Sequence, residues 1–317
     1  MSALKMPSDN NFENAVSLET LAKQDLKKTS LSKKGMGRLL FWELIERTRA
    51  IMHRKLPDIS QYKNTGKGTL LICGGGPSLA DELKTIRKLS KKAKVLSCNK
   101  THDYLLKRKI KSDYTCLLDP KEWVKDYVAN PVRRTRYLVA GQCHPMVFDK
   151  LKNYNVILWH GGVDYYGEEF PTKILQKEFP ERAWQTIAGG TTVGLRSVLV
   201  GYLLGYRDFR LFGFDSSLRE DKAHAYHKPK PYDAREGEVI LQSKLGKETF
   251  KTNSHMARQC MDFEHMIEKI AGFIKAKRFD PIELKVYGTG LLPSLASGYG
   301  LHADPEMNMK WCGRVGA

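Results

Sequence analysis

The sequence predicts an α/β fold: a Rossmann-like, doubly wound and mainly parallel sheet with helices on both faces, preceded by an N-terminal helical extension. From Thr69 onward, short apolar runs alternate with amphipathic segments of helical period. The first run, residues 69–73, leads into Gly74-Gly75-Gly76 and then Pro77-Ser78, which is the sequence form of a strand, an anion-binding loop and a helix. A second glycine turn, Gly189-Gly190, follows a later run. Glycine turns at strand ends are typical of nucleotide-binding folds.

The expected elements alternate along the chain. We expect strands at 69–73, 94–98, 114–118, 136–140, 155–159, 184–188, 208–212 and 283–287. We expect helices at 78–91, 101–109, 145–152, 192–205 and 255–277. Residues 36–56 predict an amphipathic helix with three candidate partners: its own domain, another subunit or a membrane surface. The predicted organisation is a basic N-terminal arm with this helix over 1–68, and a Rossmann-like nucleotide-binding domain over 69–317.

Composition favours a cytoplasmic globular protein. No run among the 317 residues approaches the roughly 18 apolar residues that span a bilayer, and residues 1–14 lack the apolar core of a signal peptide. The six cysteines are scattered, without a CxxC pair or a spacing that suits zinc. That pattern favours free, buried thiols in a reducing compartment. We therefore expect a cytoplasmic location and no structural metal.

The net charge of +18 is the strongest deviation in composition. Most of the excess lies in the first half of the chain, with dense clusters at 88–94 and 107–111, followed by Arg133, Arg134 and Arg136. Such a surface attracts nucleotides, nucleic acid or acidic membrane lipid. The clusters contain no interleaved aromatic residues, so they do not indicate a stacking platform for single strands. Solvated helix faces between strands are the alternative interpretation.

The loop after the first strand has the residue types that bind phosphate. Glycine lets the backbone turn sharply and approach an anion without an intervening Cβ atom, so Gly74, Gly75 and Gly76 are candidate phosphate ligands. Pro77 suits the first turn of a helix, and Ser78 supplies a hydroxyl as cap or ligand. An ordinary tight turn between a strand and a helix is the alternative.

Further polar residues follow the other predicted strands, and ligands of parallel sheets collect at the carboxyl ends of strands. Asn99 is a candidate for binding a base or ribose, and Asp119 places a carboxylate after the third strand. The remaining candidates are the turn Gly189, Gly190, Thr191 and Thr192 as a second anion site, the carboxylate of Asp215, and the loop histidines His224 and His227. Each alone is also explained as a cap or a turn. Their common sheet edge favours a site.

These motifs resemble the motility-associated-factor family. The resemblance is carried by GGGPSL, Asn99, LLDP, GGTTVGLRSVLVGYLLGYRDFRLFGFD and HAY, in that order. That family shares a domain with the 6-hydroxymethylpterin diphosphokinases and is similar to the family 42 sialyltransferases. The resemblance implies a transferase domain that holds an activated nucleotide. Phosphate would lie at the glycine loop, the nucleoside near Asn99 and Asp119, the opposite wall at Gly190–Thr192, and the donor or acceptor beside Asp215.

In the family 42 sialyltransferases a histidine acts as general base on the acceptor hydroxyl. Here the residues before the last long predicted helix read Thr252-Asn253-Ser254-His255, in which the histidine is displaced. This departure from the pattern makes His224 and His227 the alternative candidate bases.

Three activities follow from the resemblance and the charge. The leading prediction is glycosyl transfer, without a bound metal, from a nucleotide-activated donor such as a CMP-linked nine-carbon acid to a hydroxyl of a glycan, protein or nucleic acid. The second is Mg²⁺- and ATP-dependent diphosphoryl transfer to a pterin-like alcohol, with Asp119 and Asp215 as the visible Mg²⁺ ligands. It ranks lower because Asp119 stands singly before Pro120. The third is a nucleic-acid-directed, DNA-modifying transferase, which the +18 charge favours.

Overall fold

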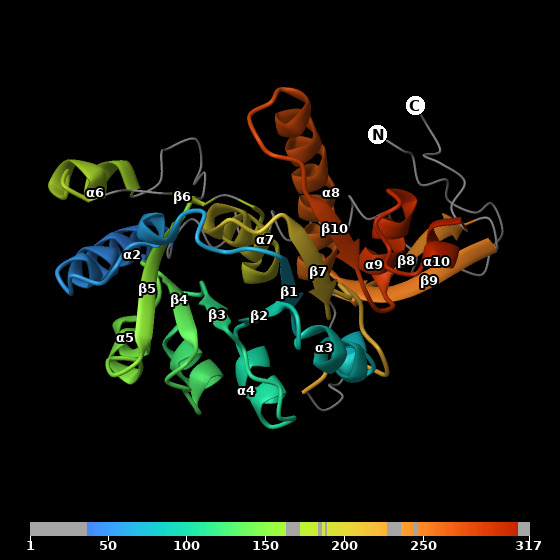
Figure 1. Cartoon of the computed structure of the whole chain (residues 1–317), viewed down its shortest axis with the longest axis horizontal. Coiled ribbons are helices and arrows are strands. Elements are labelled where there is room, and N and C mark those ends of the chain that lie inside the picture. The colour runs from blue at the N-terminus through green and yellow to red at the C-terminus, as the bar shows by residue number, and fades with distance from the viewer. Residues whose placement is uncertain are drawn as a thin grey trace. The chain divides into compact units, whose positions relative to one another are not determined.

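The computed structural model describes residues 37–162, 172–182, 186–187, 189–226, 236–243 and 246–309 (Figure 1). The chain divides into two compact units. The glycine-loop unit contains the described residues of Gly74–Ile86 and Arg210–Ala317. The sheet unit contains the described residues of Leu31–Cys73 and Arg87–Phe209.

Eight strands form the main sheet, in the order β10-β7-β1-β2-β3-β4-β5-β6. Their bounds are β1 Thr69–Cys73, β2 Lys94–Cys98, β3 Tyr114–Leu117, β4 Arg136–Ala140, β5 Asn155–Gly161, β6 Thr186–Ile187, β7 Asp208–Phe212 and β10 Glu283–Val286. Neighbouring strands from β1 to β6 pair in parallel. The predicted α/β fold with a mainly parallel sheet is confirmed, and each predicted strand is present with its ends within two residues of the expected ones.

Helices cover the strands of the sheet unit on two sides. The α-helices are α2 Gly37–Met52, α3 Leu83–Leu89, α4 Thr101–Leu106, α5 Pro145–Lys150, α6 Thr172–Glu178, α7 Val193–Leu204, α8 Ser254–Lys275, α9 Leu291–Gly298 and α10 Pro305–Met309. Short 3-10 helices are η2 Ile59–Tyr62, η3 Pro77–Ala80 and η4 Glu122–Val128. Helix α7 packs against β1, β2, β3 and β6, and Figure 1 shows it on the opposite side of these strands from α4 and α5.

The strand order reverses between β1 and β7. Strands β1 to β6 follow one another across the sheet, whereas β7 lies on the other side of β1, beside β10. Such a switch point is where open α/β sheets bind ligands, because the loops after the two strands lead in opposite directions and leave room between them. The loop after β1 begins with Gly74, and the loop after β7 begins with Gly213.

The central strands are buried because helices cover both faces of this part of the sheet. From β1 to β5, every strand residue after the first is buried. The matching sequence runs are nearly continuous in apolar residues, which is why strand positions were predictable. No helix in the described part of the chain combines the length and apolarity required to cross a membrane.

Several elements differ from the expected ones. Helices α6, α9 and α10 and the short helices η2 and η4 were not predicted. An antiparallel hairpin of β8, Glu236–Ser243, and β9, Gly246–Asn253, was not predicted. Strand β9 contains Phe250 as its one large apolar residue, so no apolar run marks it. The single helix expected at 78–91 is divided into η3 and α3.

The predicted amphipathic helix is α2, and it packs on its own unit. Ile45 and Ile51 are fully buried. Arg47 donates to the Pro120 carbonyl at 2.6 Å, and Arg49 forms an ion pair with Glu178. Of the three partners considered for this helix, its own domain is the one that its buried apolar side chains contact.

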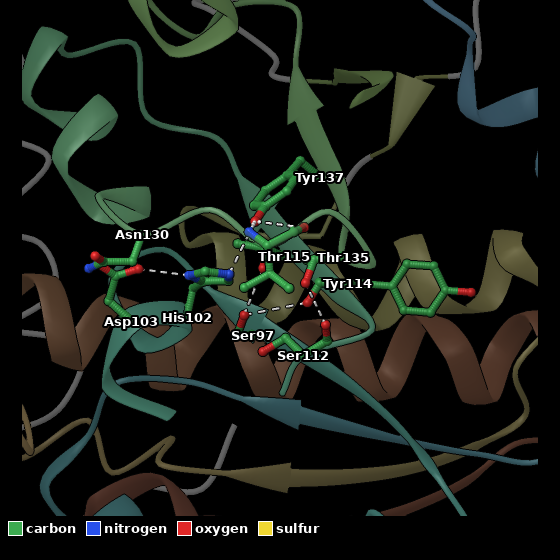
Figure 2. A network of polar contacts seen from close by, with 10 residues as sticks. Ser97, His102, Asp103, Ser112, Tyr114, Thr115, Asn130, Thr135 and Tyr137 are labelled. Carbon is green, nitrogen blue, oxygen red and sulfur yellow. Dashed lines mark hydrogen bonds and ion pairs between the residues drawn. The ribbon is translucent and has the colours of Figure 1, made fainter. Parts of the chain in front are cut away.

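A buried polar network ties the segment before β4 to α4 (Figure 2). His102 is 2% exposed; its Nδ1 lies 2.8 Å from Asp103 Oδ1, and its Nε2 lies 3.2 Å from the Tyr137 hydroxyl. Asn130 donates to the other Asp103 oxygen at 2.8 Å, and the Val132 N–H donates to the Tyr137 hydroxyl at 2.6 Å. Burial acts to raise the pKa of Asp103, but the bonds from His102 and Asn130 outweigh it and lower that pKa.

We expect Tyr137→Phe to lower the free energy of unfolding by about 1–3 kcal/mol, because the partly buried Val132 N–H and the buried His102 Nε2 lose their partner. Tyr154→Phe is the control, since Tyr154 packs edge-on against Tyr137 and is half-buried. Urea denaturation measures both variants. An equal loss in the two would contradict a role for the Tyr137 hydroxyl.

Candidate functional site

The loops after β1 and β7 run side by side within the glycine-loop unit. The N–H of Gly74 donates to the Phe212 carbonyl, and the N–H of Gly76 donates to the Gly213 carbonyl, both at 2.8 Å. A Cβ atom at Gly74 would lie 2.5 Å from the Gly213 oxygen, and Gly213 has a φ of 67°. Glycine is therefore required at 74 by the approach of the two backbones and at 213 by its left-handed conformation.

The carboxylate of Asp215 joins these two loops. It is 3% exposed, and its Oδ1 accepts the Ser78 N–H at 2.8 Å while its Oδ2 accepts the Ser78 hydroxyl at 2.9 Å. A Cβ atom at Gly76 would overlap the same carboxylate. The buried Pro77 lies between these residues at the start of η3. The loop thus fits closely around Asp215, and phosphate binding by Gly74, Gly76 and Ser78 stays a prediction.

The environment of Asp215 disfavours its charged form. Burial raises its pKa from 3.8 to about 6, although the bonds from Ser78 and the nearby Arg219 guanidinium act in the opposite direction. Near neutral pH the carboxylate is ionised at a cost to stability. A buried, perturbed carboxyl group beside a glycine loop is a feature of functional sites.

The raised pKa of Asp215 predicts that the free energy of unfolding depends on pH. Between about pH 4 and pH 6 the unfolded chain ionises Asp215 while the folded chain keeps it protonated, so stability falls as pH rises through this window and the cost persists above it. A rise from 3.8 to about 6 corresponds to about 3 kcal/mol. We expect the wild type to lose about this much relative to Asp215→Asn between pH 4 and pH 7, in urea denaturation. A difference that does not vary with pH would contradict the raised pKa.

The segment after β7 folds back over Gly75. The Ala225 N–H donates to the Gly75 carbonyl at 3.0 Å, and the rings of His224 and Tyr226 stack with 5.2 Å between centroids and 19° between planes. A Cβ atom at Gly75 would lie 2.6 Å from the Tyr226 hydroxyl and 3.1 Å from His224 Nδ1. Glycine at 75 thus makes room for two side chains that can exchange protons, and it brings the candidate base His224 to the glycine loop.

The loops after β1 and β7 meet at Asp215, and we call this contact the junction. Arg219, a cation beside the junction, was not recognised from the sequence. The Arg219 guanidinium lies 2.5 Å from Asp81 Oδ2 and donates to the Thr289 hydroxyl at 2.7 Å. Its side chain is 39% exposed, and its charge acts to lower the pKa of Asp215. The available signal was its place four residues after the candidate carboxylate.

Asn99 and Asp119 belong to the sheet unit. Asn99 follows β2 with a φ of 51°, and its Oδ1 is buried without a hydrogen-bond partner. Asp119 follows β3, and its Oδ1 accepts the Lys121 N–H at 2.9 Å. Because buried acceptors are rarely left without a partner, the Asn99 side chain is the better suited of the two to meet a ligand.

The second glycine turn also belongs to the sheet unit and leads into α7. Gly189 and Gly190 have φ values of 122° and 85°. Thr192 caps the helix through its hydroxyl, Thr191 is exposed, and Arg196 donates to the Gly190 carbonyl at 2.8 Å. The Thr192 cap and the Arg196 guanidinium thus hold the turn in place. Its role as a second anion site stays a prediction.

The predicted site residues therefore fall into two groups. One group lies in the glycine-loop unit, where its members are joined by direct contacts or are adjacent in the sequence: Gly74, Gly75, Gly76, Pro77, Ser78, Asp215 and His224. The other group lies in the sheet unit: Asn99, Asp119 and the turn Gly189–Thr192. His227 lies outside the described residues. His255 is exposed in the first turn of α8. Within the described ranges, no three His, Cys, Asp or Glu side chains are grouped so as to hold a metal ion.

Comparison with known proteins adds a family. A family model described as 6-hydroxymethylpterin diphosphokinase MptE-like matches residues 43–221, which is more than half of the chain. The chain belongs to this family. The resemblance expected from the motifs is confirmed, and the family supports a transferase. The match includes Asp215 and ends before His224, so the candidate base lies outside the matched segment.

The MptE-like fold also has a solved counterpart. The structure of the MAf glycosyltransferase from Magnetospirillum magneticum AMB-1 is similar with a TM-score of 0.54 and 16% sequence identity, over 80% of this chain and 37% of that chain. At this identity the likeness shows the fold, and the present chain spans little more than a third of the other's length. In a comparison with curated proteins, no sequence matches.

Proposed function

We propose that this MptE-like protein is a glycosyltransferase that moves a sugar from a nucleotide-activated donor, with a CMP-linked sugar as the candidate, to an acceptor hydroxyl. The observation that carries the proposal is the junction at the switch point. There His224 and the buried carboxylate of Asp215 both contact the glycine loop. They occupy the space that side chains at Gly75 and Gly76 would need. The similar solved structure is that of a glycosyltransferase, which supports the same class of reaction.

The residues of this junction have distinct roles in the proposed reaction. His224 accepts the proton of the acceptor hydroxyl as its oxygen attacks the anomeric carbon of the sugar. The bond between that carbon and the donor phosphate oxygen breaks, and the electron pair leaves with the nucleotide. Arg219 is the cation at the junction that would neutralise the departing phosphate. Asp215 is a positioning residue, because it holds Ser78 and with it the end of the glycine loop.

Within the sheet unit, Asn99 keeps its predicted role as a contact for a base or a ribose. Its buried Oδ1 without a partner would accept a hydrogen bond from a base amino group or a ribose hydroxyl. Asp119 and the turn Gly189–Thr192 lie in the same unit, and their roles as nucleotide-binding residues stay predictions.

The description of the family favours a second candidate, Mg²⁺- and ATP-dependent diphosphoryl transfer to a pterin-like alcohol. The carboxylates fit it less well. Both Asp215 oxygens accept hydrogen bonds from Ser78 in a buried place, and Asp119 uses one oxygen on Lys121. Mg²⁺ in phosphoryl-transfer sites keeps several waters and takes carboxylates that face the solvent-filled site. This difference in the carboxylates supports sugar transfer as the first candidate.

A nucleotide panel separates the two reactions. Thermal shifts are measured with CMP, UMP, UDP, GDP, AMP and ATP, each with Mg²⁺ and with EDTA, because a ligand that binds only the folded state raises the melting temperature. We expect stabilisation by a pyrimidine nucleotide in EDTA. Stabilisation by ATP alone, and only with Mg²⁺, would replace sugar transfer by the diphosphokinase reaction.

A further inference from the structure

One edge of the sheet unit is strongly basic. Nine exposed lysines and arginines immediately precede strands β2, β3 and β4 or begin them, and we call this set the basic edge: Lys91, Lys92, Lys94, Lys107, Lys109, Lys111, Arg133, Arg134 and Arg136. They include the clusters that the sequence singled out, and the proposed transfer reaction uses none of them.

The topology brings these residues to one edge. Strands β2, β3 and β4 are parallel neighbours, with Leu96 opposite Tyr114 and Tyr114 opposite Arg136. Segments that precede parallel neighbours meet at the amino-terminal edge of a sheet, about 4.8 Å apart per strand. Asn99 and Asp119 follow β2 and β3 and so lie at the opposite, carboxyl-terminal edge. The basic edge is thus separate from the predicted ligand-binding edge of this unit.

Acidic residues scarcely offset this charge. Residues 87–111 contain ten lysines and arginines and a single acidic residue, Asp103. Asp103 is buried against His102 and Asn130 and does not contribute to the surface. Just beyond, Asp113 pairs with Lys94 at 2.7 Å and neutralises one member of the set.

The polar network of Figure 2 holds the basic segments in place relative to one another. The Thr135 hydroxyl donates to the Ser112 carbonyl at 2.8 Å, which ties the segment of Arg133 and Arg134 to the segment before β3. Arg87 donates to the Arg108 carbonyl at 2.9 Å and ties the end of α3 to the end of α4. A surface fixed in advance loses less conformational entropy when it binds a partner.

The side chains at this edge favour nucleic acid over a membrane. Membrane-surface segments combine basic residues with large apolar side chains that enter the bilayer. The exposed large apolar residues of the described chain are Trp123, Met146 and Met309, and none of them lies within residues 91–94, 107–111 or 133–136, which hold the basic edge. Arg108 covers the Tyr104 ring at 3.5 Å, so this aromatic is not free to stack on a base. The chemistry is that of phosphate neutralisation without stacking, which suits a duplex.

We propose that the basic edge binds the phosphate backbone of double-stranded nucleic acid. This is a binding site for a macromolecule at the amino-terminal edge of the strands of the sheet unit, and it holds whichever small molecule is transferred. Such contacts carry no sequence information, so the affinity should be similar for unrelated duplexes and should fall steeply with salt.

The test is fluorescence anisotropy of a labelled 20-base-pair DNA duplex from 50 to 250 mM KCl. The triple variant Lys92→Gln, Lys107→Gln, Lys111→Gln should weaken binding about tenfold or more near 100 mM and reduce the slope of log K against log salt by about 2–3. The matched control is Lys269→Gln, Lys275→Gln, Lys277→Gln, which removes the same charge from exposed positions on and after α8.

The proposal is supported if the control triple variant keeps the wild-type affinity and salt slope while the basic-edge triple variant loses affinity. An equal loss in both triples would show a response to net charge alone and would overturn it. Vesicles with and without 30% phosphatidylserine form the second arm. Binding to the acidic vesicles with no measurable binding to the duplex would assign the edge to a membrane and overturn the proposal as well.

Discussion

Replacing His224 by alanine is expected to lower the turnover of sugar transfer by about 10²–10⁴-fold, the usual contribution of a general base. Nucleotide affinity should change little, because the proposed role of His224 is toward the acceptor hydroxyl. The two quantities are measured separately, as the rate of nucleotide release from the donor at saturation and as the dissociation constant of the nucleotide by calorimetry. A loss in rate at constant affinity is the signature of a group that acts in the transition state.

His265→Ala is the matched control, since His265 is an exposed histidine of α8 in the same unit. It should keep the wild-type rate. His255→Ala separates the proposed base from the histidine nearest to the position that the sialyltransferase pattern uses. Full activity of His224→Ala together with an inactive His255→Ala would transfer the role of base to His255.

The second large effect is expected from a single methyl group. Gly75→Ala places a Cβ atom 2.6 Å from the Tyr226 hydroxyl and 3.1 Å from His224 Nδ1. Because both are side-chain atoms, the ring pair can move aside and the fold is retained. A displacement of about 1 Å at a catalytic group costs about 100-fold in rate, so we expect a loss of at least that size with a nearly unchanged melting temperature.

Gly272→Ala is the control for this substitution. Gly272 lies in α8 with no atom within 4 Å of its Cβ position, and alanine there should raise the free energy of unfolding by about 0.5–1 kcal/mol without affecting turnover. If Gly75→Ala retained the wild-type rate, the segment of His224 and Tyr226 would have no part in the chemistry.

The sheet was predictable because its strands are buried on both faces and therefore appear as short apolar runs. The glycine loop was predictable for the same local reason, since Gly74 follows β1 directly. Hairpin β8–β9 was not predictable, because β9 is polar and is formed by pairing with β8 rather than by an apolar run of its own.

The contacts that define the candidate site depend on the tertiary structure. The Cβ positions of Gly74, Gly75 and Gly76 face protein atoms of the loop after β7, which no local pattern indicates, and the phosphate binding expected of these glycines stays a prediction. The sequence separates Ser78 from Asp215 by 137 positions, and no local pattern indicates that they are bonded. Arg219 was missed for the same reason, since its partner Thr289 comes from yet another segment.

Sugar transfer is tested most directly by incubating the protein with an equimolar mixture of CMP-, UDP- and GDP-linked sugars, ATP and a hydroxyl acceptor mixture, once in EDTA and once with Mg²⁺. Each nucleotide is followed by mass spectrometry. We predict that one nucleotide sugar is consumed and its nucleotide released in EDTA, and that His224→Ala suppresses this release. Consumption of ATP alone, dependent on added Mg²⁺ and with every nucleotide sugar intact, would contradict the proposed function.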